Sequence, residues 1–316
     1  MSAIIEVDEL RRTFVVRRRR GRLRRYRHEV RAVDGISFEI GAGEAVGYIG
    51  PNGAGKSTTV KMLTGILVPT SGLLRVAGLD PSARRTELAR HIGVVFGQRT
   101  GLWWDLPLRD SYELLGRIYR VPRRTYEANL EGLVDLLELG GLLEQPVRQL
   151  SLGQRMRGDI AAALLHDPKI LYLDEPTIGL DVVSKAKLRE FLSELNAERS
   201  TTILLTTHDL VDIEQVCRRV MVIDHGRLVF DGGFEQLHRE GGARRTVVVD
   251  LAAPADPLAV EGATVTRIDG ARQSLSLPAG ASAAPVVAAL GTRDDLVDLS
   301  IQEPAIEDVI TSLYSH

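Results

Sequence analysis

A segment in the first fifth of the chain has the residue types and spacing that bind the phosphates of a nucleotide. GPNGAGKST, residues 50–58, matches the pattern G-x-x-x-x-G-K-[ST]. Its glycines allow the backbone to curl so that N–H groups point toward phosphate oxygens. Lys56 adds a positive charge for the β- and γ-phosphates, and the hydroxyl of Ser57 is a suitable ligand for Mg²⁺. The pattern therefore predicts a site for ATP and Mg²⁺.

A pair of acids further along the chain complements this loop. The apolar residues 170–173 predict a short buried strand, and Asp174 and Glu175 follow at its carboxyl end. Ligand-binding groups of open parallel sheets gather at that end. We expect Asp174 to hold Mg²⁺ through its water shell, and Glu175 to be the general base that orients and polarises the attacking water. The acids therefore predict hydrolysis of the bound ATP.

The neighbours of the loop have the patterns needed to position it. The apolar residues 45–49 predict a buried strand, and residues 57–67 have helical spacing. The new helix adds the positive end of its dipole to the phosphate site. Strand, glycine-rich loop and helix in this order are the context that the pattern requires. The residues that we expect to bind the nucleotide here are Gly50, Pro51, Asn52, Gly53, Ala54, Gly55, Lys56, Ser57 and Thr58.

Further segments give the chain a resemblance to the nucleotide-binding subunits of ABC transporters, over roughly residues 4–236. VVFGQRT resembles the Q-loop, LSLGQ the signature, GLD the D-loop and LLTTHD the switch segment. The resemblance implies that Gln98 contacts Mg²⁺ and water and that His208 contacts the γ-phosphate, so both join Lys56 and Glu175 as catalytic candidates. It also implies a D-loop role for Asp181.

The signature of this family contacts ATP held by the other subunit of a dimer. The resemblance therefore implies that Ser151, Gly153 and Gln154 act in trans on a second copy of the chain. Leu152 replaces the usual second glycine of the signature. Because Leu does not approach phosphate as closely as Gly, we expect altered trans contacts with function kept.

An aromatic side chain is expected to stack on the adenine ring. In the family this residue precedes the phosphate loop, and the two candidates are Phe14 and Tyr26. We favour Phe14, which lies where the family pattern places the stacking residue. Tyr26 lies within a basic insert, and ordinary strand packing is the alternative for either ring.

The resemblance implies an α/β fold, with a P-loop NTPase core of the ABC ATPase type and a helical subdomain. We expect the ABC ATPase domain over residues 1–240, with the helical subdomain at about 98–166. Gly241 and Gly242 predict a linker. A small α+β domain is expected over residues 243–316, and it resembles the C-terminal extension of many ABC-2-type exporter ATPases.

The basic insert from Arg17 to Arg27 contains eight arginines. The chain has a net charge of −2, so removing these eight charges leaves −10. Like charges at this density favour an exposed segment. Three interpretations stay open: a solvated hairpin, contact with an anionic membrane surface, and binding to nucleic acid or another partner, of which nucleic acid is disfavoured.

Composition and the chain's beginning favour a protein of the cytoplasm. Cys217 is the single cysteine, which excludes a disulfide within the chain and suits a reducing compartment. MSAIIEVDEL lacks the basic and apolar regions of a signal peptide. No apolar run is long enough to span a bilayer. We therefore expect a peripheral protein on the cytoplasmic face of the membrane, with the pore on another polypeptide.

The segment with both tryptophans bears on the membrane partner. Trp103 and Trp104 are adjacent, so both cannot easily face one core. One of them is a candidate anchor in the groove that accepts a permease helix; burial of both is the alternative. LWWDLP resembles a bacterial subgroup of drug or viologen type, whose ATPases are encoded with two ABC-2 permeases.

Together, these features predict the ATPase of an ABC-2-type exporter. Two ATP molecules would be held between two copies of the chain, and closure of the dimer would move separate permease subunits. An importer ATPase is the nearest alternative. A soluble ABC ATPase that acts on nucleic acid or ribosomes is the alternative from another class, although only the arginine insert favours it.

Overall fold

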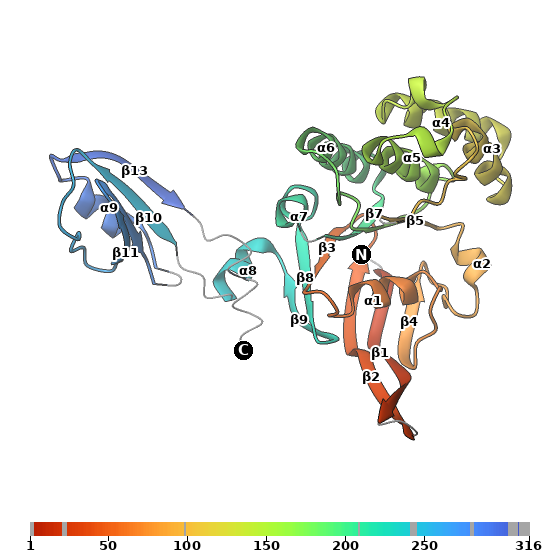
Figure 1. Ribbon diagram of the computed structural model, residues 1–316, viewed down its shortest axis with the longest axis horizontal. Helices are drawn as coiled ribbons and strands as arrows, with labels where there is room; N and C mark the ends of the chain where they lie inside the picture. The colour runs from red at the N-terminus through yellow and green to blue at the C-terminus, as the bar shows by residue number, and fades with distance from the viewer. Residues whose placement is uncertain are drawn as a thin grey trace. The chain divides into compact units, whose positions relative to one another are not determined.

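Two compact units make up the chain in a computed structural model: residues 1–231 and 232–316. The structure describes residues 3–20, 24–97, 99–207, 209–240, 245–278, 281–302 and Val309. The domain boundary expected at 240–243 is about nine residues further along the chain and stays a prediction. The linker predicted at Gly241 and Gly242 lies outside the described residues. The fold class is confirmed: an α/β unit of mixed sheets and a smaller unit built on an antiparallel sheet (Figure 1).

The first unit contains two sheets and most of the helices. Its strands are β1 (Ala3–Arg20), β2 (Arg24–Gly41), β3 (Ala45–Ile49), β4 (Ser71–Val76), β5 (Ile92–Phe96), β6 (Ile170–Asp174), β7 (Thr202–Thr206), β8 (Arg219–Asp224) and β9 (Arg227–Gly232). Its helices are α1 (Lys56–Leu63), α2 (Arg85–Leu88), α3 (Leu108–Ile118), α4 (Arg123–Leu136), α5 (Leu152–Leu164), α6 (Val182–Arg199) and α7 (Leu210–Val216), with short 3-10 turns at Gly140–Leu142 and Val147–Gln149.

The larger sheet positions the candidate site. Its strand order is β5-β6-β7-β3-β8-β9, and the pairs from β5 to β8 are parallel. All residues of β3 and β7 are buried, as expected for strands covered on both faces. Because β3, β6 and β7 are neighbours, the loops after their carboxyl ends meet at one edge of the sheet.

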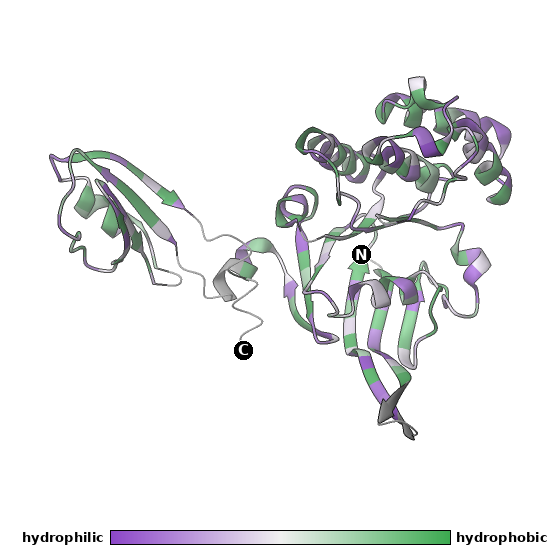
Figure 2. Cartoon of the chain, in the orientation of Figure 1, coloured by the Kyte–Doolittle hydropathy of each residue, from purple (hydrophilic) through white to green (hydrophobic). Residues whose placement is uncertain are grey.

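Helix α1 lies between this sheet and a smaller antiparallel sheet of order β2-β1-β4. One hydrophobic core joins buried side chains of both sheets and of α1, among them Ile5, Ile36, Met62, Tyr172 and Met221. Helices α3, α4, α5 and α6 gather at the opposite side of the larger sheet (Figure 1). Figure 2 shows mixed polar and apolar residues along these helices, as expected where one face of a helix is buried.

Strands β1 and β2 form a long ribbon. Their backbones pair from Ala3 opposite Gly41 to Arg20 opposite Arg24, whereas β4 pairs with β1 only between residues 5 and 11. The outer part of the ribbon therefore extends beyond the third strand. The backbone of residues 17–20 and 24–27 of the arginine insert belongs to this outer part. Residues 21–23, and the side chains of residues 17–20 and 24–26, lie outside the described part of the chain.

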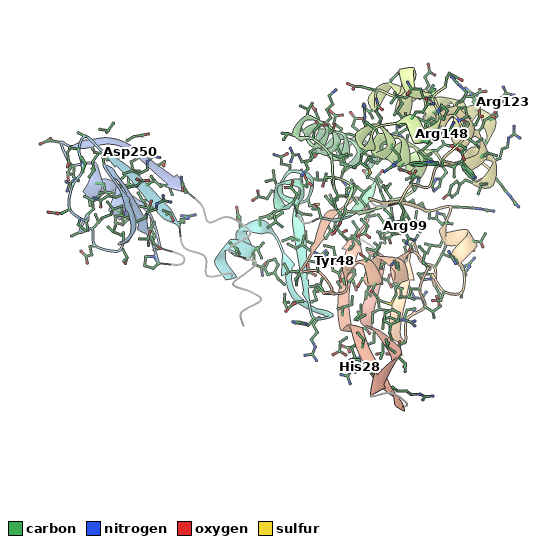
Figure 3. All side chains as sticks on the ribbon, viewed as in Figure 1. His28, Tyr48, Arg99, Arg123, Arg148 and Asp250 are labelled. Atoms are coloured by element: carbon green, nitrogen blue, oxygen red, sulfur yellow. The ribbon has the colours of Figure 1, made fainter. Side chains whose placement is uncertain are left out.

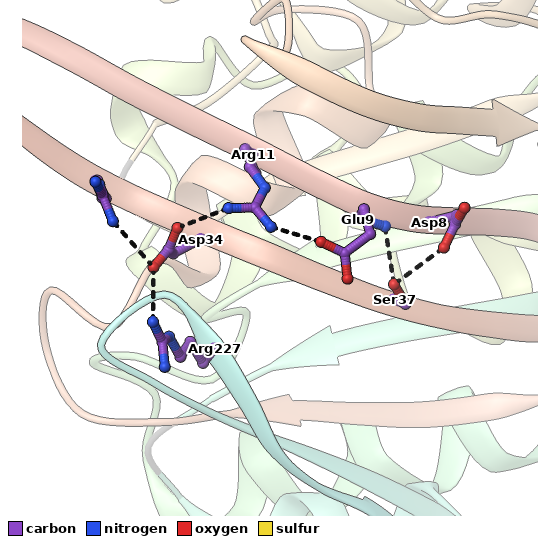
Figure 4. A network of polar contacts seen from close by, with 7 residues as sticks. Asp8, Glu9, Arg11, Asp34, Ser37 and Arg227 are labelled. Carbon is purple, nitrogen blue, oxygen red and sulfur yellow. Dashed lines mark hydrogen bonds and ion pairs between the residues drawn. The ribbon is translucent and has the colours of Figure 1, made fainter.

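A polar network ties the ribbon to the turn between β8 and β9 (Figure 4). Arg11 donates to Glu9 at 2.6 Å and to Asp34 at 3.4 Å, and Arg227 donates to Asp34 at 3.1 Å. The hydrogen bond from Arg227 lowers the pKa of Asp34. The N–H of Asp34 also donates to the carbonyl of Gly226 at 2.8 Å, so side chains and backbone hold the same junction.

The second unit begins with α8 (Phe234–Glu240) and contains a four-stranded antiparallel sheet. The strands are β10 (Thr246–Leu251), β11 (Thr264–Asp269), β12 (Arg272–Ser276) and β13 (Leu296–Gln302), in the order β11-β12-β10-β13, and α9 (Ala284–Leu290) completes the unit. Val247, Leu275 and Leu290 are fully buried in its own core. No helix in the described part of the chain is long and apolar enough to cross a membrane.

Candidate nucleotide-binding site

The phosphate loop lies between the end of β3 and the start of α1. Two of its glycines are required because neighbouring backbone approaches closely. A Cβ atom on Gly50 would lie 2.1 Å from the carbonyl oxygen of Ile223, and one on Gly55 would lie 2.5 Å from that of Ala32. Gly55 also has a φ of 116°, which favours glycine. The packing of β2 and β8 against the loop therefore fixes its curl.

Two further backbone hydrogen bonds hold the loop, one within it and one from the turn between β8 and β9. The N–H of Ala54 donates to the carbonyl of Pro51 at 3.1 Å, and the carbonyl of Ala54 accepts from Gly226 at 2.9 Å. Asn52 and Gly53 are exposed, and Thr58 is half-buried. The turn between β8 and β9 thus holds the loop at Ala54, while Asn52 and Gly53 remain exposed.

Lys56, the first residue of α1, is buried against this loop. It is 7% exposed, and its Nζ donates to the carbonyl oxygens of Gly50 at 2.6 Å and Pro51 at 3.1 Å. Burial lowers the pKa of the ammonium group, and the charges of Glu175 and Asp174 raise it. The loop's own carbonyls therefore hold the ammonium group in a place where phosphate oxygens can replace them.

Asp174 joins three elements at the carboxyl edge of the sheet. It ends β6 and accepts a hydrogen bond from the hydroxyl of Thr206 at 2.6 Å, at the end of β7. The hydroxyl of Ser57, in α1, lies 3.5 Å from the same carboxylate oxygen. Hydroxyl and carboxylate oxygens are the donors that Mg²⁺ prefers. No cluster of three or more His, Cys, Asp or Glu that could hold a metal occurs among the described residues.

Glu175 has a strained backbone. Its φ is 56°, the left-handed region that few residues other than glycine adopt. Its N–H donates to the carbonyl of Thr206 at 2.8 Å, and the N–H of Gly97 donates to the carbonyl of Asp174 at 2.8 Å. A Cβ atom on Gly97 would lie 2.1 Å from the carbonyl oxygen of Glu175. Strands β5, β6 and β7 therefore impose the direction in which Glu175 leaves the sheet.

The two acids share a cavity with groups from α1 and from the end of β5. Its lining includes Ser57, Phe96, Gly97, Arg99, Asp174 and Glu175. The structure thus brings together Ser57, Asp174 and Glu175 as the sequence predicted, and Lys56 is close enough for their charges to shift its pKa. Gln98 and His208 lie outside the described residues, so their assigned roles stay predictions.

The signature segment, residues 150–154, begins α5. Ser151 is the N-cap, and its hydroxyl accepts from the N–H of Gln154 at 3.2 Å. The N–H of Ser151 donates in return to the side-chain oxygen of Gln154 at 2.9 Å. This reciprocal capping pair satisfies amide donors at the start of the helix. Residues that the sequence assigned to trans contacts therefore also hold the helix end in their own chain.

Leu152 packs against the D-loop of its own chain. A Cβ atom on Gly179, whose φ is 70°, would lie 2.5 Å from a methyl carbon of Leu152. Next to it, a Cβ atom on Gly153 would lie 3.3 Å from the hydroxyl of Ser184. The leucine that departs from the family pattern therefore fills space left by a glycine in the loop after Glu175.

Asp181 is the N-cap of α6. Its carboxylate accepts from the N–H and the hydroxyl of Ser184 at 2.9 and 2.8 Å, and these bonds lower its pKa. The hydroxyl of Ser184 also lies beside Gly153. Asp181 thus braces the junction between D-loop and signature.

Phe14 lies opposite Val30 in the β1–β2 ribbon and is half-buried. The guanidinium of Arg12 lies over the Phe14 ring, 4.6 Å from its centroid. One ring face is therefore covered by a cation of the same chain. The side chain of Tyr26 lies outside the described residues, so Phe14 as the adenine-stacking residue stays a prediction.

Two buried aspartates that the sequence analysis missed connect the site to helices. Asp159, on α5, accepts from the hydroxyl of Thr100 at 2.8 Å and the N–H of Gly101 at 2.9 Å. Asp212, on α7, accepts from Thr177 at 2.6 Å and pairs with Arg189 at 3.2 Å. An acid inside the apolar run GDIAAALL was the one available signal for Asp159.

A groove adjoins the cavity of the two acids, because Ile66, Phe96 and Arg99 line both. Its lining includes Ile92, Phe96, Arg99, Leu115, Tyr119 and Asp159. Trp103 and Trp104 are 38% and 49% exposed, so the alternative in which both are buried is wrong, and the anchoring role of one of them stays a prediction. The guanidinium of Arg155 lies 5.5 Å from the centroid of Trp104. Neither tryptophan is among the groove's lining residues.

Comparisons with known proteins agree with this geometry. The family model of the ABC transporter matches residues 33–178. The ABC transporter ATP-binding protein NatA of Bacillus subtilis is 36% identical over 66% of the chain and 85% of its own length. The daunorubicin resistance ATP-binding protein DrrA3 of Streptomyces coeruleorubidus is 34% identical over 90% of the chain and 91% of its own length. Nod factor export ATP-binding protein I of Rhizobium meliloti is 41% identical over 63% of the chain and 59% of its own length.

Solved structures give the same result. An ATP-binding subunit of an ABC transporter covers 75% of the chain and 92% of its own length, with 26% identity and a TM-score of 0.64. A dimeric ATP-binding cassette bound to ADP and Pi, in a post-hydrolysis state, covers 72% of the chain and 98% of its own length, with 26% identity and a TM-score of 0.62.

Replacing Asp159 with Asn is expected to stabilise the protein at neutral and alkaline pH. Burial raises the pKa of Asp159 to about 6. A carboxyl group with a raised pKa stabilises the fold below its ordinary pKa and loses this contribution as the pH rises through about 6. Asn keeps an acceptor oxygen for Thr100 and Gly101 without the charge. We expect a gain in unfolding free energy of roughly 3 kcal/mol at pH 8 and little gain at pH 4.

Urea unfolding at both pH values measures this difference. Asp135→Asn, which changes an exposed aspartate of α4 in the same unit, is the matched control and should change little at either pH. If Asp159→Asn raised the unfolding free energy equally at pH 4 and pH 8, the buried charge of Asp159 would not be the cause of the lower stability of the parent protein.

Proposed function

The chain belongs to the ABC transporter family of ATP-binding proteins, and on this basis we propose that it hydrolyses ATP to power an ABC-2-type membrane exporter. Family membership confirms the resemblance predicted from the motifs. The observation that carries the proposal is the meeting of Lys56, Ser57, Asp174 and Glu175 at one edge of the sheet. The names of the similar proteins, which include drug resistance and Nod factor export, support export rather than import.

Each group at this edge has a role in the proposed hydrolysis. The loop's N–H groups and Lys56 bind the β- and γ-phosphates of ATP. Ser57 and Asp174 would hold Mg²⁺, which supplies charge neutralisation at the phosphates when bound. Glu175 accepts a proton from the attacking water and orients it toward the terminal phosphorus. Gln98 and His208 are proposed to complete the site around that water and the γ-phosphate.

We propose that two copies of the chain close around two ATP molecules. Helices α1 and α5 lie well apart in Figure 1, so the signature at the start of α5 is remote from its own phosphate loop. Ser151, Gly153 and Gln154 would therefore contact the nucleotide of the second copy, as would Asp181 at the adjoining loop. The similarity to a dimeric cassette supports this arrangement. The adenine ring would stack on Phe14.

The permease subunits are proposed to dock at the groove lined by Phe96, Leu115 and Tyr119. This groove is predominantly apolar, which suits the side chains of a cytoplasmic helix. It also shares Arg99 with the cavity of Asp174 and Glu175, so a docked helix would be next to the hydrolytic site. Docking would hold the chain on the cytoplasmic face of the membrane.

Replacing Glu175 with Gln is expected to lower the rate of ATP hydrolysis at least about 100-fold, because the general base is lost while the acceptor geometry remains. Binding of Mg·ATP should persist, so the tagged variant should stay in the closed state. The measurements are ATPase activity and mass spectrometry of the proteins that co-purify with the variant from solubilised membranes in Mg·ATP.

Glu190→Gln is the control, since Glu190 is an exposed residue of α6. Multi-spanning export permeases in the eluate are the expected result. Recovery of a solute-binding protein with importer permeases would replace the export proposal with import. Ribosomes or nucleic acid without permeases would contradict both transport functions.

The arginine-rich end of the β1–β2 ribbon is proposed to contact anionic lipid head groups. Basic residues near such a surface contribute about 1 kcal/mol each, and salt screens the attraction. Changing Arg17, Arg18, Arg19 and Arg20 to Gln should therefore weaken binding to vesicles containing phosphatidylglycerol at least about 100-fold. Vesicles of phosphatidylcholine alone should bind neither protein.

Co-sedimentation at low and high salt measures this binding. The matched control changes four exposed arginines elsewhere, namely Arg75, Arg90, Arg124 and Arg199, and should retain most of the binding. Equal losses in both variants would show that only net charge matters. Tighter binding to single-stranded RNA than to anionic vesicles would favour nucleic acid instead.

A further inference from the structure

Arg99 is a cation at the hydrolytic site to which the family motifs assign no role. It follows the short turn after β5, where its N–H donates to the carbonyl of Phe96 at 3.0 Å. It lines the same cavity as Ser57, Asp174 and Glu175. Figure 3 labels it in the region between the α1 side of the unit and the helical side.

The guanidinium of Arg99 has no hydrogen bond or ion pair with any other side chain in the part of the chain that the structure describes. Lys56, in contrast, is held by two backbone carbonyls, and Asp174 accepts a bond from Thr206. An exposed arginine therefore lines the cavity of Ser57, Asp174 and Glu175, which the proposed function assigns to the terminal phosphate of ATP. A guanidinium fork matches phosphate oxygens in geometry and charge.

We infer that Arg99 binds the terminal phosphate of ATP in its own chain, and that the segment from Arg99 to Gly101 transmits this contact to the signature helix. The inference rests on the proposed ATPase function and deepens it. ADP lacks the terminal phosphate, so the contact distinguishes the two nucleotides.

The transmission follows from the hydrogen bonds of the next two residues. The hydroxyl of Thr100 and the N–H of Gly101 both donate to one carboxylate oxygen of Asp159, at 2.8 and 2.9 Å. Asp159 is 9% exposed and lies on α5, which begins at Ser151. A helix rises about 1.5 Å per residue, so Asp159 is roughly 12 Å from the signature along a rigid element. Movement of Arg99 toward a phosphate therefore acts on the helix that carries the trans contacts.

The same segment borders the groove proposed for the permease. Arg99 and Asp159 line that groove as well as their own sites. The three consecutive residues from Arg99 to Gly101 would thus contact the terminal phosphate, the signature helix and the docking groove. The alternative is that Arg99 contacts only a partner docked in the groove. Nucleotide binding measured on the isolated chain distinguishes this role from phosphate binding.

The experiment compares ATP and ADP binding in the Glu175→Gln background, with fluorescent nucleotide analogues and Mg²⁺ present. Adding Arg99→Gln should weaken ATP binding about 10- to 100-fold, the effect of losing a charge-assisted hydrogen bond, and leave ADP binding within about twofold. Arg99→Lys should recover part of the ATP affinity, because it keeps the charge without the fork. Arg90→Gln, an exposed arginine outside both cavities, should change neither nucleotide.

Transmission has a separate readout, the ATP-dependent formation of the dimer measured by analytical ultracentrifugation. Asp159→Ala should retain the preference for ATP over ADP in the monomer and lose at least about tenfold in dimer affinity. Asp159→Asn keeps the acceptor oxygen and should dimerise as the parent protein does, which guards against simple misfolding of the alanine variant.

Several outcomes would overturn the inference. Equal losses of ATP and ADP binding in Arg99→Gln would indicate a general electrostatic effect. Unchanged binding of both nucleotides, with loss of permease co-purification, would assign Arg99 to the groove alone. If the wild-type chain neither prefers ATP nor hydrolyses it, the proposed function itself fails. If the wild type hydrolyses ATP and the Arg99→Gln variant binds both nucleotides as the parent does, only the role of Arg99 is rejected.

Discussion

The candidate site depends on the close approach of backbones at the carboxyl edge of the parallel sheet. Gly97 lies so near the backbone of Glu175 that a Cβ atom would be 2.1 Å from its carbonyl oxygen, and Gly50 has an equally short approach to Ile223. The first contact brings the ends of β5 and β6 together, and the second brings the ends of β3 and β8 together, in both cases without an intervening side chain. Two N–H donors, those of Gly97 and Glu175, then fix the strand ends. The left-handed backbone of Glu175 is maintained by this framework, since such a conformation persists only where its surroundings over-determine it.

Buried carboxylates extend this framework to the helices. Asp159 fastens the segment after β5 to α5, and Asp212 fastens the loop after Glu175 to α7. Both are nearly inaccessible, at 9% and 1% exposure, so leaving their partners unmet would cost far more than a surface hydrogen bond. Each helix is therefore linked by hydrogen bonds to one segment of the candidate nucleotide site. Under the proposed function, these attachments would carry a change at the phosphates to the surfaces proposed to contact other subunits.

The sequence predicted those parts of the site that are formed by consecutive residues. The phosphate loop and the two acids after β6 follow from local patterns, because strand, loop and helix periodicities place them without knowledge of the tertiary fold. The contacts of Asp159 were not predicted, since they are non-local; Thr100 and Asp159 are 59 residues apart. The role proposed for Arg99 was not predicted either, because it depends on which cavity the residue lines in the fold. In sequence, each reads as one more charged residue in a chain that is 26% charged. The contact of Leu152 with Gly179 was missed for the same reason, since no periodicity relates the two positions.

That contact gives the unusual leucine of the signature a physical role. A glycine at position 152 would leave the D-loop glycine without a side chain to pack against, and a cavity there would loosen both segments. With leucine present, the start of α5 and the loop after Glu175 touch directly, and Ser184 and Asp181 brace the same junction. The signature is therefore in packing contact with the loop that follows Glu175, the proposed general base of the same chain. Because the signature is proposed to serve the nucleotide of the second copy, this junction joins the base of one site to the trans contacts of the other, and the two sites of a closed dimer would be coupled through packing within each chain.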